Sequence, residues 1–138
     1  MVEAQQSEST AAAGTVRPVI VVGYSSKPEG RAALARALDE ARLRDAELAV
    51  VHTSADVEVA DLRAELEASG VPYEVTEAAD ALDPAEELIA TAEGRSAEFI
   101  IIGLRRRSPV GKLLLGSNAQ RVLLDAPCPV LAVKAAAG

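Results

Sequence analysis

Aromatic side chains are nearly absent from this 138-residue chain. It has two tyrosines, one phenylalanine and no tryptophan, so aromatic residues make up 2% of the sequence. Proteins that hold single-stranded nucleic acid stack bases on aromatic side chains, and a formal net charge of −7 opposes binding to a phosphate backbone. Nucleic acid is therefore not an expected partner. With hydrophobic residues at 49%, we expect a core of Ala, Val, Leu and Ile.

Cysteine and histidine are equally scarce, with one of each. The single cysteine, Cys128, cannot form an internal disulfide and fits a reducing compartment. The single histidine, His52, has no Cys, Ser or acidic partner at a recognisable spacing. Because a general base needs a positioned partner, we expect His52 to be structural and Cys128 to be a small buried residue. The sequence shows no cluster of metal ligands.

Long apolar runs are missing too. No segment approaches the roughly 20 apolar residues that a membrane-spanning helix needs, so no membrane association is expected. The first residues, MVEAQQSESTAAAGT, lack the basic and apolar regions of a secretory signal. They are polar and rich in Ala and Ser, which predicts a disordered tail over residues 1–15 and one domain over 16–138. These features predict a cytoplasmic protein.

The rest of the chain alternates between two patterns. Short apolar runs, typical of strands buried on both faces, are separated by segments whose apolar residues recur with helical spacing. Strands are predicted over 18–23, 47–53, 71–76, 98–103 and 129–133. The intervening helices are predicted to start near residues 26, 59, 83 and 117. This alternation predicts an α/β fold, a Rossmann-like three-layer α/β/α domain with a mainly parallel five-stranded sheet.

The segment GLRRRSPVGKLLLGSN, residues 103–118, is the strongest candidate for a binding site. In an open parallel sheet, ligands bind beyond the carboxyl ends of the strands, and this segment follows the fourth predicted strand. Gly103 is expected to leave the strand and permit close backbone approach. The helix start at Gly116, Ser117 and Asn118 favours an anion. An ordinary helix N-cap at Ser117 or Asn118 explains these residues as well.

Three consecutive arginines, Arg105–Arg107, stand in the same segment of this acidic chain. They are explained either by a bound anion or by a solvated turn whose exposed ion pairs contribute about 0–1 kcal/mol each. Two standard phosphate-binding patterns are absent. Lys112 lacks the upstream glycine and the following Ser/Thr of a P-loop, and no G-x-G-x-x-G follows the first strand. The chain is therefore not expected to be a P-loop NTPase or a typical NAD enzyme.

Three segments carry a resemblance to a known family: PVIVVGYSS (18–26), EFIIIGLRRRSPVGKLLLGSNAQRVL (98–123) and APCPVLAVK (126–134). Over residues 17–134 the chain resembles the universal stress proteins. The resemblance implies an adenine-nucleotide alpha hydrolase-like fold with strand order 3-2-1-4-5, and a homodimer joined through the C-terminal strand. It also implies binding of ATP or AMP. The only metal then expected is Mg²⁺ brought by the nucleotide.

The nucleotide motif of this family, Gly-x2-Gly-x9-Gly-Ser/Thr, falls on Gly103, Arg106, Gly116 and Ser117. By this resemblance, the phosphates and the ribose would be held by Gly103, Gly116, Ser117 and Asn118. Arg106 stands where the family has its second glycine. Its guanidinium either blocks close backbone approach or clamps a phosphate directly.

Three residues at two further strand ends complete the predicted site. Tyr24 and Ser25, after the first strand, and Thr53, after the second, are expected to face the base and the sugar. Nucleotide-binding members tend to carry an acidic residue where Ser25 stands. This departure and Arg106 leave open a second function, that of a dimeric interaction or regulatory protein whose site no longer binds nucleotide. Catalysis is not expected, because no general base or metal site can be named, although a weak ATPase activity is left open.

Overall fold

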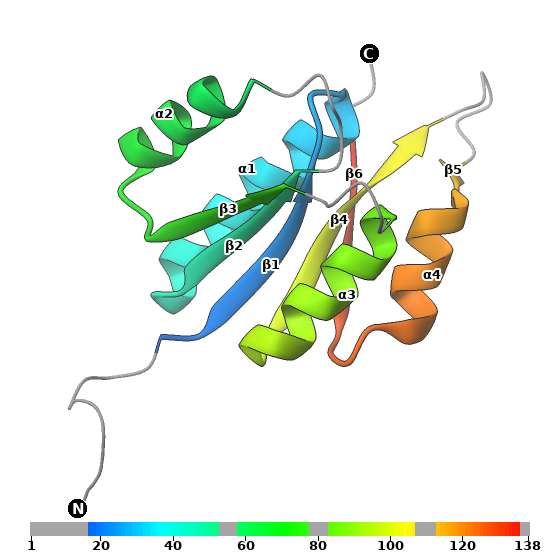
Figure 1. The fold of residues 1–138 in the computed structure, drawn as a ribbon. Coiled ribbons are helices and arrows are strands. Elements are labelled where there is room, and N and C mark those ends of the chain that lie inside the picture. The colour runs from blue at the N-terminus through cyan, green and yellow to red at the C-terminus, as the bar shows by residue number, and fades with distance from the viewer. Residues whose placement is uncertain (1–16, 53–57, 78–82, 107–112, 136–138) are drawn as a thin grey trace, which may run out of the picture.

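The computed structural model describes residues 17–52, 58–77, 83–106 and 113–135. Strands and helices alternate along these ranges, except that β4 is followed by the short strand β5 (Figure 1). The elements are β1 (Val19–Tyr24), α1 (Pro28–Arg44), β2 (Glu47–His52), α2 (Val59–Ser69), β3 (Tyr73–Glu77), α3 (Pro84–Arg95), β4 (Phe99–Arg106), β5 (Leu113–Leu114), α4 (Ser117–Asp125) and β6 (Val130–Lys134). The tail predicted over 1–15 lies outside the described residues.

Five strands form a parallel sheet in the order β3-β2-β1-β4-β6. This is the predicted order 3-2-1-4-5, because β6 is the fifth of the longer strands along the chain. Helices α1 and α2 cover one face of the sheet and α3 and α4 cover the other (Figure 1). The predicted three-layer α/β/α architecture is confirmed.

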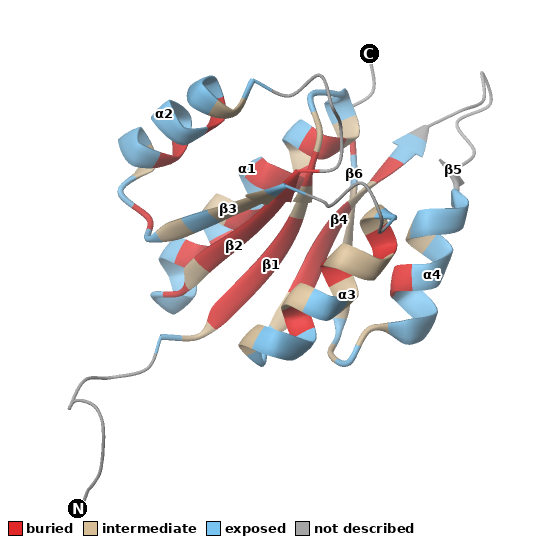
Figure 2. Ribbon diagram, viewed as in Figure 1, coloured by how far each residue is buried: buried red, intermediate tan, exposed pale blue. Residues whose placement is uncertain are grey.

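The apolar runs of the sequence are explained by burial on both faces of the sheet (Figure 2). Along β1, Ile20 and Val22 join the core beneath α1 and α2. Val21 belongs to a second core, beneath α3 and α4, that also contains Leu88. Because successive side chains of a strand point to opposite faces, a strand covered on both sides needs apolar residues at every position.

Strand β4 is longer than predicted. The sequence suggested that the strand ends at Gly103, yet the backbone continues in strand conformation to Arg106. Pairing explains the extension: Gly103 and Leu104 pair with β6, and Arg105 pairs in antiparallel fashion with Leu114 of β5. Gly103 therefore lies inside the strand, and Arg105 belongs to the sheet rather than to a solvated turn.

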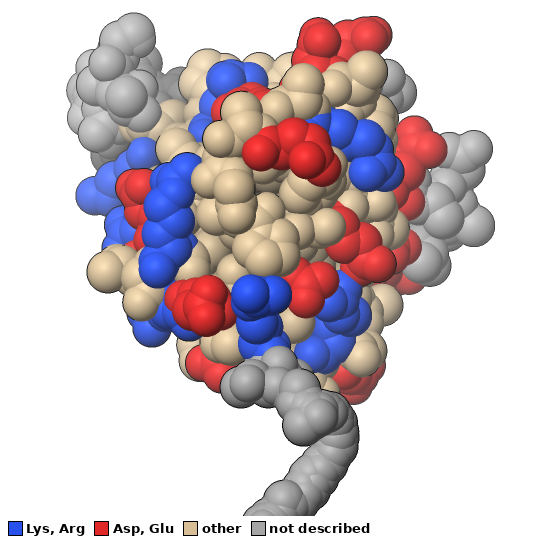
Figure 3. Space-filling view, turned by 90° about the vertical axis from the view of Figure 1, so that its left-hand side faces the viewer, with Lys and Arg blue, Asp and Glu red and all other residues tan. Residues whose placement is uncertain are grey.

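The surface on the side of α2 and β3 mixes charges of both signs (Figure 3). Ion pairs connect neighbouring elements of the fold; for example, Arg95 at the end of α3 pairs with Glu74 of β3 and, at 3.0 Å, with Glu47 of β2. None of the helices within the described ranges is both long enough and apolar enough to cross a bilayer.

Candidate functional site

An open cleft of about 640 Å³ lies at the carboxyl ends of β1 and β4. Its walls come from the turn after β1, the first turns of α1 and α3, the end of β4 and the start of α4. Strands β1 and β4 are neighbours at which the strand order changes direction, and this is where open α/β sheets bind ligands. The volume falls within the range of about 300–1,000 Å³ typical of small-molecule sites.

Five residues proposed from the sequence line this cleft: Ser25, Gly103, Gly116, Ser117 and Asn118. They come from three separate parts of the chain. The sheet brings them together because β1 and β4 are parallel neighbours and their carboxyl ends share one edge. The five residues chosen from strand ends and a helix start therefore lie together on one cleft.

Of the other three proposed residues, Tyr24 lies elsewhere, and Thr53 and the side chain of Arg106 are outside what the structure describes. Tyr24 is buried in the core beneath α1, where its hydroxyl oxygen accepts a hydrogen bond of 3.0 Å from Nη1 of Arg31. Its neighbour Gly23 faces the cleft, so strand alternation turns Tyr24 the other way. Thr53 lies outside the described residues. Arg106 ends β4, and its side chain is not among those described.

Two glycines allow α1 to begin directly against the sheet. A Cβ at Gly103 would overlap the backbone carbonyl of Glu29, and a Cβ at Gly30 would overlap the backbone and hydroxyl of Ser25. The first turn of α1 is therefore fixed against both β4 and the turn after β1. Gly103 is explained by packing inside the protein, which the sequence alone did not reveal.

Gly116 has a different environment. A Cβ there would meet no atom within 4 Å in the described structure, and its φ of −67° is open to any residue. It is the N-cap of α4, and no described side chain caps this helix. Ser117 and Asn118 follow it inside the helix, so neither is the N-cap that the sequence allowed. The uncapped first turn of α4 lines the cleft, and its N–H groups favour an anion.

Three described charged side chains line the cleft: Lys27, Glu29 and Arg105. The Nε atom of Arg105 lies 3.3 Å from Oε2 of Glu29, and the Glu29 side chain is 16% exposed. Sequence reasoning missed Lys27 and Glu29. Their position directly after the first strand was the available signal, but the approach of α1 to β4 depends on tertiary packing.

Arg121 ties together the two helices on the other side of the cleft. Its guanidinium lies 2.9 Å from Oδ2 of Asp83 and 3.3 Å from Oε1 of Glu86, both at the start of α3. Asp83 is the predicted N-cap of α3, and its Oδ1 accepts a 2.8 Å hydrogen bond from the Glu86 backbone N–H. The start of α3 is thus fixed relative to α4.

His52 and Cys128 are not among the described residues that line the cleft. His52 is 4% exposed, and its Nε2 lies 4.0 Å from Oε2 of Glu77. Cys128 is half-buried against the core beneath α3 and α4, and this burial raises the pKa of its thiol. A thiol held in its protonated form is a poor nucleophile. Within the described ranges, no group of His, Cys, Asp and Glu could hold a metal ion.

Comparison with known proteins shows to which family the chain belongs. The family model of the universal stress proteins matches residues 54–134. A universal stress protein of Mycolicibacterium smegmatis is 46% identical over 127 residues, which cover 84% of this chain and 97% of that protein. The chain belongs to the universal stress protein family.

Solved structures of this family share the fold. A universal stress protein from Archaeoglobus fulgidus superposes with a TM-score of 0.64 at 29% identity, over 87% of this chain and 100% of that one. A universal stress protein from the same organism in complex with dAMP gives a TM-score of 0.59 at 25% identity, over 86% and 98% of the two chains. In the present universal stress protein, the first and third glycines of the family motif, Gly103 and Gly116, lie on the same cleft.

Proposed function

We propose that the protein is a cytoplasmic universal stress protein that binds an adenine nucleotide, AMP or ATP, in the cleft between β1 and β4. The observation that carries the proposal concerns Gly116. The described atoms around it leave room for a side chain, so packing within the described protein does not require a glycine there. A glycine that packing does not require is explained if a ligand approaches its backbone closely. Gly116 also occupies the third glycine position of the family motif.

The charges and hydroxyls of the cleft suit a nucleoside monophosphate or triphosphate. The phosphates would lie against the start of α4, where Ser117 and Asn118 add polar side chains to the helix dipole. Lys27 and Arg105 bring positive charge from the other walls. The hydroxyl of Ser25 is available to the ribose. The related structure in complex with dAMP, at 25% identity, supports an adenine nucleotide in particular.

Calorimetric titration with AMP and ATP tests the proposal. Gly116→Ala and Gly94→Ala form a matched pair, because a Cβ at either glycine meets no described atom within 4 Å but only Gly116 lines the cleft. We expect Gly116→Ala to weaken binding about tenfold, which corresponds to about 1.4 kcal/mol, and Gly94→Ala to bind as the wild type does. Absence of binding by the wild type at millimolar nucleotide, or equal binding by both variants, would contradict the proposal.

A homodimer through β6 is part of the same proposal. β6 lies at the edge of the sheet, paired on one side with β4, and its apolar residues Val130 to Val133 are all half-buried. An edge strand with partly exposed apolar side chains needs either protection or a partner. Light scattering on the purified protein should give twice the mass of one chain, and a monomeric mass would remove this part of the proposal.

A second candidate function is supported by Ser25, which offers no carboxylate where nucleotide-binding relatives tend to have one. The protein would then be a dimeric interaction or regulatory protein of the same fold, whose site no longer binds nucleotide. Arg106→Gly discriminates between the two functions. If this change creates ATP affinity that the wild type lacks, the second function holds. Release of phosphate from ATP by the wild type, lost in Ser117→Ala, would instead add ATP hydrolysis to the first function, nucleotide binding.

A further inference from the structure

Glu29 places a carboxylate inside the cleft. Its backbone carbonyl lies against Gly103, so the residue cannot move away from β4 without shifting the first turn of α1. Its side chain is 16% exposed, and Oε2 lies 3.3 Å from Nε of Arg105. The cleft therefore carries an anion of its own, held next to one of its two described cations.

This carboxylate competes with any ligand anion for Arg105. A phosphate that pairs with Arg105 has either to displace Glu29 or to sit beside it, and like charges at such short range repel each other. The repulsion grows with the negative charge of the ligand. Lys27, from the turn before α1, is the other described cation of the cleft, so the described charged side chains of the lining, Lys27, Arg105 and Glu29, sum to about one positive unit.

We propose that Glu29 sets the charge preference of the nucleotide site: it penalises ligands in proportion to their phosphate charge and so favours AMP over ATP. This inference rests on the proposed function. A rival role for Glu29 is that of a ribose acceptor, in place of the carboxylate that Ser25 does not provide. Oε2 of Glu29 lies next to the guanidinium of Arg105, at the β4 side of the cleft. This position favours the role in charge selection.

The experiment compares wild type and Glu29→Gln in titrations with adenosine, AMP, dAMP and ATP. Glutamine keeps the size of the side chain and removes its charge. We expect the variant to bind ATP about tenfold more tightly and AMP about threefold more tightly, with adenosine changed by less than about twofold. The gain should shrink at high salt, because exposed charges are screened.

Glu65→Gln is the matched control. Glu65 also pairs with an arginine, Arg31, at 3.7 Å, but it is not among the described residues that line the cleft. This variant changes the net charge by the same amount, so it should bind each ligand as the wild type does. An equal gain in ATP affinity for both variants would show a general charge effect and overturn the role of Glu29.

Other outcomes separate this inference from the function on which it rests. If the wild type binds AMP and ATP but Glu29→Gln changes the affinity for every ligand by the same factor, the charge-selection inference is wrong and nucleotide binding stands. If the variant loses AMP affinity and keeps dAMP affinity, Glu29 is a ribose acceptor and the inference is overturned. If neither folded protein binds any of the four ligands, the proposed function itself fails.

Discussion

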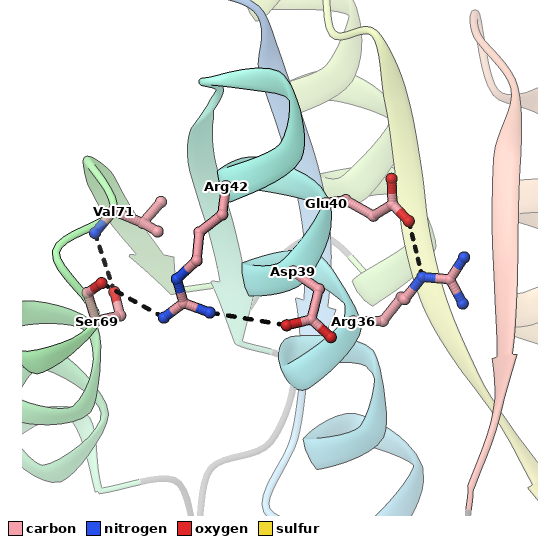
Figure 4. Close-up of polar contacts among 6 residues, drawn as sticks. All are labelled: Arg36, Asp39, Glu40, Arg42, Ser69 and Val71. Carbon is pink, nitrogen blue, oxygen red and sulfur yellow. Dashed lines mark hydrogen bonds and ion pairs between the residues drawn. The ribbon is translucent and has the colours of Figure 1, made fainter.

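Two glutamates, one near each end of α1, differ in where their arginine partners come from. Glu40, near the C-terminal end, accepts a 2.8 Å hydrogen bond from Nε of Arg36 and lies 3.1 Å from Arg44 (Figure 4 shows the Arg36 contact). Its side chain is 10% exposed, and Arg44 lies over the ring of Phe99 at 5.1 Å. At the N-terminal end, Glu29 faces an open cleft and pairs with Arg105, which is 56% exposed.

Within one helix, Glu40 thus belongs to the framework of the fold, whereas Glu29 belongs to the cleft. The partners of Glu40 are two arginines of its own helix, each with a side chain 48% exposed, so its negative charge is balanced within α1. Among the described side chains, Glu29 has a single partner, Arg105, which comes from a strand, and both side chains line the cleft, where their charges face any bound ligand. The N-terminal end of α1 is held by close backbone contact, through Gly103 and Gly30, rather than by ion pairs.

The largest effect is expected where backbone packing holds α1. Gly103→Ala should lower the free energy of unfolding by about 3 kcal/mol or more, because its Cβ would overlap the Glu29 carbonyl and neither backbone can move freely. Gly94→Ala, in α3, should change stability by less than about 1 kcal/mol and in the stabilising direction. Urea denaturation of both variants measures the difference. Equal stability would show that α1 does not depend on this contact.

A smaller loss is expected at the other end of the helix. Glu40→Gln removes the carboxylate that pairs with Arg36 and Arg44, so its denaturation midpoint should fall, though less than that of Gly103→Ala. Asp39→Asn is the control, because Asp39 is 71% exposed and lies 3.7 Å from Arg42 (Figure 4). Exposed pairs of this kind contribute about 0–1 kcal/mol. If Asp39→Asn costs as much as Glu40→Gln, burial has no special role at Glu40.

Acid should reveal the same contrast. The hydrogen bond from Arg36, together with the charges of Arg36 and Arg44, lowers the pKa of Glu40 below its ordinary value of 4.5. A lowered pKa in the folded state stabilises the protein above the unfolded pKa, and that stabilisation is lost as the pH falls through the folded pKa. The stability difference between wild type and Glu40→Gln should therefore be full at neutral pH and should shrink below pH 4.5. A difference that is constant with pH would contradict this origin.

The smallest change in stability is expected at the cleft. Glu29→Gln breaks an ion pair with an exposed arginine, so its free energy of unfolding should stay within about 0.5 kcal/mol of the wild type. Thermal melting at low salt measures this change. A loss as large as that of Glu40→Gln would place Glu29 in the framework of the fold and remove the contrast between the two residues.

The sheet was predictable because each long strand has a local signature. The run EFIIIG at 98–103, for example, buries Ile100 and Ile102 on one face of the sheet and Ile101 on the other, and Asp83 caps its helix as predicted. The two-residue strand β5 was missed, since two leucines carry no periodicity. The end of β4 was missed for a related reason: pairing with β5 and β6, rather than the identity of Gly103, decides where that strand stops.

In the site, local reasoning worked for the helix start and failed for contacts between distant parts of the chain. The motif spacing identified Gly116, Ser117 and Asn118, which line the cleft. Glu29 and Arg105 stand 76 positions apart in the sequence, so only the packing of α1 on β4 shows that they meet. Tyr24 was assigned by its closeness to a strand end, without the alternation that turns it toward α1.

Helix α4 contributes one buried residue, Val122, whereas α1 contributes six. The wall that carries Gly116 and Ser117 is therefore held by little apolar burial and by the contacts of Arg121 with α3. Segments with few buried contacts open locally at a lower free energy than the whole domain unfolds. Amide hydrogens of α4 should thus exchange with solvent well before those of β1 and β4, and a ligand bound against this helix would slow that exchange without altering the sheet.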